Sequence, residues 1–114
     1  MSTFEGMSEY EDSRSVKKFC VEYGKDTAIV SRGYLIVNYR GAIKDKPVGL
    51  IEDIWTEEKY RGQGLASIII YQLINIARRE GCYKITLACN DKNVGLYEKF
   101  GFKKHQNAMR LSLC

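Results

Sequence analysis

The sequence is poor in several residue types that define particular protein classes. Its 114 residues include one proline, one tryptophan and one histidine, and no apolar run approaches the length of a membrane span. Residues 1–6 show no basic segment followed by an apolar one, so a secretory signal is not expected. These absences favour a cytoplasmic globular protein over a membrane protein or a secreted one.

The cysteines do not have the spacing of a metal centre. Cys20, Cys82, Cys89 and Cys114 include no C-x-x-C pair, and His105 has no second histidine to join it. We expect reduced thiols that serve as small apolar residues, and a disulfide between two of them stays open. No metal is expected.

Composition and charge indicate one soluble domain. The chain is 45% hydrophobic and 28% charged, as in ordinary globular proteins, and its formal net charge is +4. The basic residues are scattered, which suits an anionic small ligand and does not indicate nucleic-acid binding. A chain of this length buries roughly two-thirds of its unfolded surface, enough for a core.

The most informative stretch is a glycine-rich turn made of Arg61, Gly62, Gln63, Gly64, Leu65 and Ala66. Residues 48–55 before it predict a strand, and residues 67–79 after it continue a helix. Glycine allows close approach of a ligand, and a helix N-terminus offers unpaired N–H donors to a pyrophosphate. The alternative is a plain tight turn with a solvated arginine; the spacing fits neither the Walker loop nor the dinucleotide fingerprint.

The N-terminal part predicts a loose segment followed by a helix and short strands. Residues 1–12 are polar and acidic, and Ser13 or Ser15 is positioned to begin a helix that ends at Gly24. Its apolar face has helical spacing, with Val16, Phe19, Cys20 and Tyr23. Residues 27–31, 34–40 and 48–55 then predict a three-stranded antiparallel meander, with turns at 32–33 and 44–47.

The C-terminal part predicts a helix, a strand, a second helix and a closing hairpin. The first helix ends at Gly81, and residues 83–89 form a strand parallel to a neighbour. Asn90 and Asp91 cap the second helix, which ends at Gly101. Segments 102–103 and 108–113 predict a hairpin. The whole chain, 1–114, therefore reads as a single mixed α/β domain around one sheet.

Two motifs resemble the GNAT superfamily of N-acetyltransferases. Arg61-x-x-Gly64-x-Ala66 at a helix start resembles its acetyl-CoA pyrophosphate motif, and the run from Asn93 through Tyr97 to Phe102 resembles its later motif. The order and separation of the two are specific to this superfamily. The resemblance implies the GNAT fold, an α+β domain with a mixed, mostly antiparallel central sheet flanked by helices, here with a shortened N-terminus.

Within the superfamily, segments 51–54, 81–85 and 92–99 resemble the eukaryotic glucosamine-6-phosphate N-acetyltransferase family. The resemblance covers roughly residues 49–109. It implies acetyl transfer from acetyl-CoA to the amine of D-glucosamine 6-phosphate, in amino-sugar metabolism. It also implies a homodimer that shares its acceptor site, and no nucleic-acid or membrane partner.

The resemblance implies roles for individual residues. Backbone groups of Ile54 and Trp55 would meet the pantetheine arm, residues 61–66 would hold the pyrophosphate, and Asn93 would lie near the thiol. Tyr97 would contact the cofactor and protonate the departing thiolate, because a phenol can act as a general acid. A helical tyrosine of this kind is otherwise ordinary core packing.

The acceptor roles fall on residues outside the glycine turn. Glu52 and Asp53 would bind the sugar and its amine, with Glu52 assisting deprotonation, and Tyr83 with Lys84 would reach the phosphate. Glu52 and Asp53 are neighbours on a strand, so they are expected to point to opposite faces; the alternative is that one of them is merely solvated. Without the motif, Tyr83 and Lys84 read as an ordinary aromatic residue and a solvated lysine.

The sequence departs from the family in its acceptor region. Ala88 and Ser112 stand where the family has an acidic residue and an arginine, and the N-terminus is too short for both the strand and the helix that wall the acceptor site. Arg110 is expected on the same strand face as Ser112 and is a candidate replacement. Two alternatives follow: a GNAT enzyme acting on a protein amine or a polyamine, or a CoA-binding module without catalysis.

Overall fold

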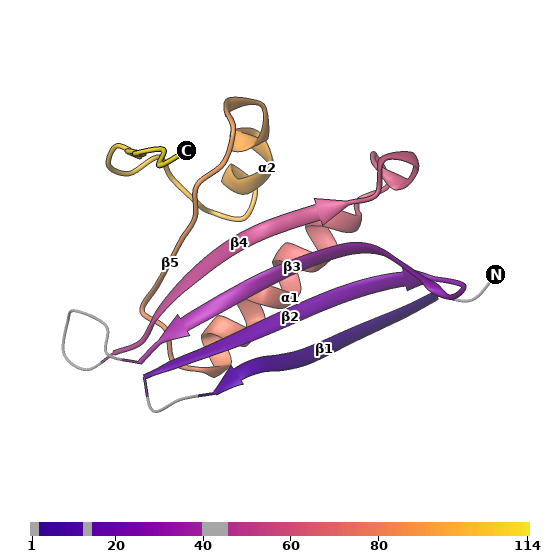
Figure 1. Cartoon of the computed structure of the whole chain (residues 1–114), viewed down its shortest axis with the longest axis horizontal. Helices are drawn as coiled ribbons and strands as arrows, with labels where there is room; N and C mark the ends of the chain where they lie inside the picture. Colours follow the sequence, from indigo (N-terminus) through magenta and orange to yellow (C-terminus); the bar gives the residue numbers. More distant parts are fainter. Residues whose placement is uncertain (1–2, 13–14, 40–45) are drawn as a thin grey trace.

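The computed structural model describes residues 3–12, 15–39 and 46–114, and five strands in it form one sheet in the order β1-β2-β3-β4-β5 (Figure 1). β1 to β4 are antiparallel neighbours, whereas β5 runs parallel to β4. This confirms the mixed, mostly antiparallel sheet. The strands are β1 (Thr3–Asp12), β2 (Val16–Lys25), β3 (Ala28–Asn38), β4 (Val48–Thr56) and β5 (Lys84–Thr86).

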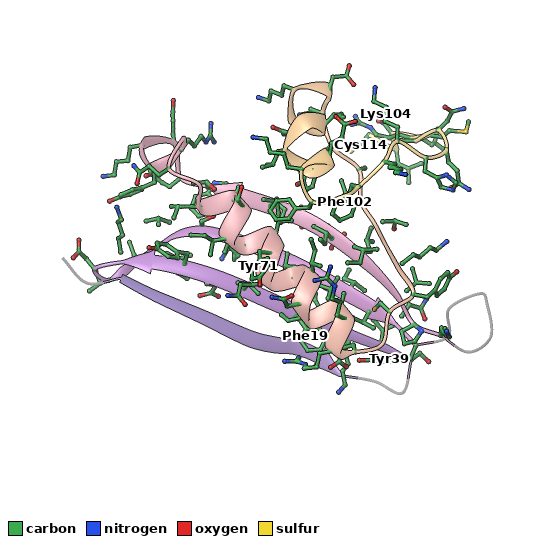
Figure 2. All side chains as sticks on the ribbon, turned by 180° about the vertical axis from the view of Figure 1, so that it is seen from behind. Phe19, Tyr39, Tyr71, Phe102, Lys104 and Cys114 are labelled. Carbon is green, nitrogen blue, oxygen red and sulfur yellow. The ribbon has the colours of Figure 1, made fainter. Side chains whose placement is uncertain are left out.

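One long helix, α1 (Leu65–Arg79), lies across one face of the sheet, as Figure 2 shows from behind. Its apolar stripe is wide enough to bury seven side chains: Leu65, Ile69, Ile70, Leu73, Ile74, Ile76 and Ala77. They pack against buried strand residues, chiefly Phe19, Val21, Leu35, Val37 and Ile51. The remaining helices are α2 (Val94–Glu98) and the one-turn 3-10 helices η1 (Glu58–Tyr60) and η2 (Asp91–Asn93).

The crossover through α1 makes β5 parallel to β4, as predicted. Gly81 leaves the helix with φ at 82°, a left-handed conformation that glycine adopts without strain. The Cys82 amide donates to the Ala77 carbonyl at 3.0 Å and the Tyr83 amide to the Pro47 carbonyl, also at 3.0 Å. The chain thus returns to the start of β4. β5 is shorter than the predicted 83–89, because pairing extends only from Lys84 to Thr86.

The N-terminal prediction was wrong. Residues 3–12 are not loose but form β1, and the predicted helix ending at Gly24 is strand β2; Ser13 lies outside the described residues. Phe19 and Val21 are both buried, and Tyr23 packs against the same core. This spacing of two is that of a strand. The apparent helical spacing arose because Cys20, on the alternate position, is buried as well.

The turn predicted at 32–33 was also wrong. β3 continues through Gly33, and the predicted second strand ends at Asn38, two residues early. Gly33 is needed for space: a Cβ there would overlap Ile54 Cδ1 and stand 2.7 Å from Ile69 Cγ2. Of the predicted turn at 44–47, only Lys46 and Pro47 lie within the described residues.

The C-terminal hairpin does not form. In residues 103–114 no strand is assigned, and Met109, Leu111 and Leu113 are 94%, 83% and 89% exposed. The alternating pattern is present, but no strand beside this segment pairs with it. The second helix is also shorter than predicted, with η2 before α2 and no side-chain cap from Asn90. Among the described residues, no helix combines the length and apolar character that crossing a membrane demands.

Candidate active site

The glycine turn lies where β4 gives way to α1. The one-turn helix η1 follows β4, after which Gly62 and Gly64 take φ values of 78° and 81°. Gly64 is the N-cap of α1, and a Cβ at either glycine would meet no atom within 4 Å. The space beside the first turn is therefore open. Since the leading N–H groups of a helix have no intrahelical acceptor, they are available to an anionic ligand.

Arg61 is held at the edge of this turn. Its Nε donates to the carbonyl of Thr56, the last residue of β4, at 3.0 Å. The Arg61 amide donates to the Glu58 carbonyl at 3.2 Å, which closes η1. The guanidinium is thus fixed to the strand end, close to the helix N-terminus. A positioned arginine of this kind gives charge-assisted hydrogen bonds to phosphate oxygens.

A β-bulge shapes the end of β4. Arg32 is paired with Trp55 and Tyr34 with Glu52, so Gly33 faces both Asp53 and Ile54. Asp53 has φ at 55°, which is rare for a residue other than glycine. The bulge breaks the side-chain alternation from which opposite faces were predicted for Glu52 and Asp53. The bulge changes the direction of β4 immediately before Ile54 and Trp55, the two residues that were predicted to meet the cofactor.

A cleft of about 370 Å³ joins the strand end, the glycine turn and α2. Its lining contains most of the residues predicted to bind the cofactor: Ile54, Trp55, Arg61, Gly62, Gly64, Leu65, Ala66, Asn93 and Tyr97. Gln63, also predicted, does not line it. The structure therefore brings two distant motifs into one cavity. The chemical roles of these residues stay predictions.

Sequence reasoning missed four lining residues: Thr56, Tyr60, Ser67 and Leu96. Thr56 ends β4 and Tyr60 is the last residue of η1, and the signal available for them was their closeness to Arg61 along the chain. Ser67 lies in the first turn of α1, one residue beyond the motif. Leu96 precedes Tyr97 in α2 and carries no chemical signal of its own.

Tyr97 is buried in α2 and lines the cleft. Its side chain is 8% exposed, and its ring meets the Phe102 ring edge to face, with centroids 5.9 Å apart at 82°. Phe102, labelled in Figure 2, lies between α2 and α1. Burial raises the pKa of the Tyr97 phenol, and the nearby thiolate of Cys89 raises it further. The phenol is therefore fully protonated at neutral pH and able to donate.

Glu52 and Asp53 lie just before the cleft rather than in its lining. Glu52 forms an ion pair with Lys18, whose Nζ is 4.0 Å from Oε1, and that ammonium also lies 4.7 Å from the Tyr34 ring centroid. Glu52 follows Ile51, a core residue facing α1, so it points to the opposite face of the sheet. Asp53 is exposed at the bulge. Both carboxylates belong to the two residues that directly precede Ile54 in β4.

Tyr83, Lys84 and Arg110 are not brought to this cleft. Lys84 is paired with Val48, and Ile54 is six positions further along β4, a span of about 20 Å. The Lys84 ammonium instead lies 5.5 Å from the Tyr83 ring centroid. Arg110 is exposed, and its Nε donates to Ser112 Oγ at 3.0 Å. The argument that Arg110 shares a strand face with Ser112 fails, because that segment is not a strand.

The fold and the two motifs that meet in this cleft are those of the GNAT family. Residues 3–102 match the acetyltransferase (GNAT) family, which is nearly the whole chain, so the protein belongs to that family.

Two individual members of the family are similar to this chain over most of its length. The chain is 39% identical over 85 residues to the glucosamine 6-phosphate N-acetyltransferase of Trypanosoma brucei brucei, covering 75% of this chain and 58% of that protein. It is also 39% identical over 85 residues to glucosamine 6-phosphate N-acetyltransferase 1 of Dictyostelium discoideum, covering 75% and 54%. The chain thus spans somewhat more than half the length of these relatives.

Solved structures agree with the fold. A Trypanosoma brucei acetyltransferase superposes with a TM-score of 0.81 at 34% identity, covering 84% of this chain and 69% of that one. The glucosamine-6-phosphate N-acetyltransferase of Arabidopsis thaliana superposes with a TM-score of 0.80 at 23% identity, covering 85% and 67%. These comparisons confirm the predicted family and fold.

Proposed function

We propose that this chain is a single acetyltransferase domain that moves acetyl from acetyl-CoA to a primary amine, with D-glucosamine 6-phosphate as acceptor. One observation carries the proposal: a single cleft is lined both by Arg61 with the open N-terminus of α1 and by Tyr97, whose phenol is buried and protonated. A pyrophosphate and a departing thiolate need these two groups, and coenzyme A carries both.

The cofactor follows the cleft from end to end. Residues 61–66, including Gln63 at the exposed turn, bind the pyrophosphate through backbone amides and the Arg61 guanidinium. Backbone groups of Ile54, which has no register partner in β3 at the bulge, and of the neighbouring Trp55 meet the pantetheine arm. Asn93, at the start of α2, lies near the thiol. The thioester is then held beside Tyr97, and most of the acceleration comes from this positioning.

The transfer is direct. The lone pair of the neutral amine attacks the thioester carbonyl, a C–N bond forms, and the C–S bond breaks as the tetrahedral intermediate collapses. Tyr97 gives its proton to the leaving thiolate, and the proton lost by the amine passes toward Glu52, directly or through water. Lys18 holds the Glu52 carboxylate in place. Acetyl-CoA is the cosubstrate, and these steps call for no metal.

The phosphate of the acceptor is bound across a homodimer. The names of the relatives support an amino-sugar phosphate, yet within one chain Tyr83 and Lys84 are about 20 Å from the cleft. A second subunit would supply Tyr83, Lys84 and Arg110 to the site. The exposed Met109, Leu111 and Leu113 support this assembly, because another copy would bury their apolar surface.

We place the protein in the cytoplasm, without a nucleic-acid or membrane partner. Cys89 and Cys114 are exposed thiols, which persist in a reducing compartment.

Transfer to a panel of acceptors tests the proposal. Acetyl-CoA is supplied with glucosamine 6-phosphate, a polyamine or a lysine peptide, and mass spectrometry identifies the acetylated product. We expect N-acetylglucosamine 6-phosphate as the main product. Acetylation of the peptide or polyamine instead would retain the enzyme and reject the acceptor. Binding of acetyl-CoA with no product from any amine would indicate a CoA-binding module.

A further inference from the structure

Arg32 lies on the face of the sheet opposite α1. Gly33 faces α1, because a Cβ there would stand 2.7 Å from Ile69 Cγ2. Side chains alternate along a strand, so Arg32 and Tyr34, on either side of Gly33, point to the other face. Figure 1 looks onto that face, and among the described elements no helix crosses it. Glu52, which is proposed to receive the amine proton, lies on the same face and is paired with Tyr34 in the register.

Two aromatic rings hold the Arg32 guanidinium in place. Its Cζ lies 5.8 Å from the Trp55 ring centroid and 5.9 Å from that of Tyr34, both within the range of a cation–π interaction. Trp55 is the register partner of Arg32 in β4 and lines the cleft, so the guanidinium stands beside the cleft. A side chain that is ordered in advance loses little freedom when a ligand binds, which favours binding.

The Arg32 guanidinium has no anionic partner in the described part of the chain. No carboxylate forms an ion pair with it there, and none of its N–H groups donates to another protein group. Its register partner in β2 is Glu22, but Glu22 Oε1 accepts from the Cys20 thiol, with 3.6 Å between sulfur and oxygen. Glu52 forms its ion pair with Lys18 instead. Arg32 is thus a positioned cation whose donors are available to an anionic ligand.

The spacing of Arg32 and Glu52 fits a sugar phosphate. The two residues are diagonal neighbours of β3 and β4, because Glu52 is paired with Tyr34, which is two residues beyond Arg32. Diagonal neighbours in an antiparallel pair lie about 7–8 Å apart. The hexose ring of glucosamine 6-phosphate, with its amine at C2 and its phosphate at C6, bridges a span of this size.

We infer that Arg32 determines acceptor specificity by binding the phosphate of the amino sugar whose amine is directed to Glu52. The inference rests on the proposed function, since it takes glucosamine 6-phosphate as the acceptor. The planar guanidinium presents its donors in a fork that matches two phosphate oxygens. A phosphate monoester carries close to two negative charges at neutral pH, so it can accept Arg32 together with cations from a second subunit. Arg32 contacts no reacting atom.

Steady-state kinetics with glucosamine 6-phosphate and with glucosamine, at saturating acetyl-CoA, test this role. We expect Arg32→Gln to raise the KM for the sugar phosphate about tenfold, the scale of one charge-assisted hydrogen bond, and to leave the KM values for glucosamine and acetyl-CoA unchanged. Arg32→Lys keeps a cation at the two rings but loses the planar fork, so it should show a smaller increase and serves if the glutamine variant does not fold. Arg78→Gln is the matched control, an exposed arginine of α1.

Two results would overturn the role of Arg32 and leave the proposed function intact. One is an unchanged KM for glucosamine 6-phosphate in both Arg32 variants. The other is an equal loss with the two acceptors, which would mean that Arg32 only holds the Trp55 ring and the sheet. If the unaltered chain acetylates neither sugar, or does not prefer the phosphorylated one, the proposed acceptor is wrong and the role of Arg32 is rejected with it.

Discussion

Gly33 and Ile54 occupy the same small volume of the sheet: the missing side chain of Gly33 is the space that Ile54 Cδ1 fills from the bulge in β4. Ile69 and Leu73 of α1 close the space from below, at 2.7 Å and 3.1 Å from the position of a Cβ at Gly33. The cleft and the core are therefore connected, because Ile54, which lines the cleft, packs against Gly33 in the neighbouring strand β3.

Gly33→Ala should destabilise the protein, because neither Ile54 nor α1 can retreat without opening the core. We expect a loss of about 1–3 kcal/mol in the free energy of unfolding, as for overpacked cores. Gly95→Ala is the control, since a Cβ there meets no atom within 4 Å and alanine favours a helix. Urea denaturation measures both, and equal stability of the two variants would contradict this role for Gly33.

Arg61 should contribute to cofactor binding through charge and through position. We expect Arg61→Ala to weaken acetyl-CoA binding about tenfold, on the scale of a charge-assisted hydrogen bond to phosphate. Arg61→Lys should recover part of this, because it keeps the charge but loses the Nε bond to the Thr56 carbonyl. Arg78→Ala, exposed at the other end of α1, is the control for net charge. Unchanged affinity in Arg61→Ala would remove Arg61 from the site.

Glu80 should make the free energy of unfolding depend on pH in the acidic range. The Tyr39 hydroxyl donates to Glu80, which is the main reason that the pKa of this carboxyl is lowered, with Arg79 adding to the effect. A lowered pKa means that the stabilisation is complete above the ordinary glutamate range and is lost as pH falls through the folded-state value. Tyr39→Phe should therefore cost about 1 kcal/mol at pH near 7 and less in acid.

Thermal melts across the acidic range measure this difference. Glu98→Gln is the control, because Glu98 is exposed and belongs to α2 rather than to this contact. A gap between the wild-type and Tyr39→Phe melting temperatures that stayed constant with pH would contradict the linkage.

Tyr97 should remain protonated beyond the range of an ordinary tyrosine. Burial is the larger cause of its raised pKa and the Cys89 thiolate the smaller, so the midpoint of its ionisation should lie above the usual value of 10.0. The difference in phenolate absorbance between wild type and Tyr97→Phe during alkaline titration isolates this group. Cys89→Ser should lower the midpoint only slightly. A midpoint below 10 would show that the phenol is solvated, against its 8% exposure.

The part of the fold that was predictable is the part with local signals. The strand, glycine turn and helix from Val48 to Arg79 are marked by glycines and by a wide apolar stripe, and the structure has all three. The N-terminal helix was mispredicted because the apolar spacing of residues 16–23 fits a helix and also fits a strand that is buried on both faces. Gly33 was taken for a turn because nothing local indicates that a glycine makes room for another strand.

The residues predicted for the site also fall into a part that the sequence could predict and a part that it could not. The residues predicted to bind the cofactor cluster in two short motifs, and the structure brings most of them into one cleft. Of the residues predicted to bind the acceptor, Tyr83, Lys84 and Arg110 lie away from the cleft within one chain. The contact of Lys25 with the Tyr60 ring was not predicted, because these residues are far apart in sequence and only the fold brings them together.

The most direct measurement is the rate of thiol release from acetyl-CoA with glucosamine 6-phosphate, run in parallel on wild type and Tyr97→Phe, with glucosamine as the comparison acceptor. We predict release that depends on the sugar phosphate, is weak with glucosamine, and falls by about 10²-fold or more in Tyr97→Phe while acetyl-CoA affinity is unchanged. No release with either sugar, or equal rates in the two proteins, would contradict acetyl transfer to this acceptor with Tyr97 as the proton donor.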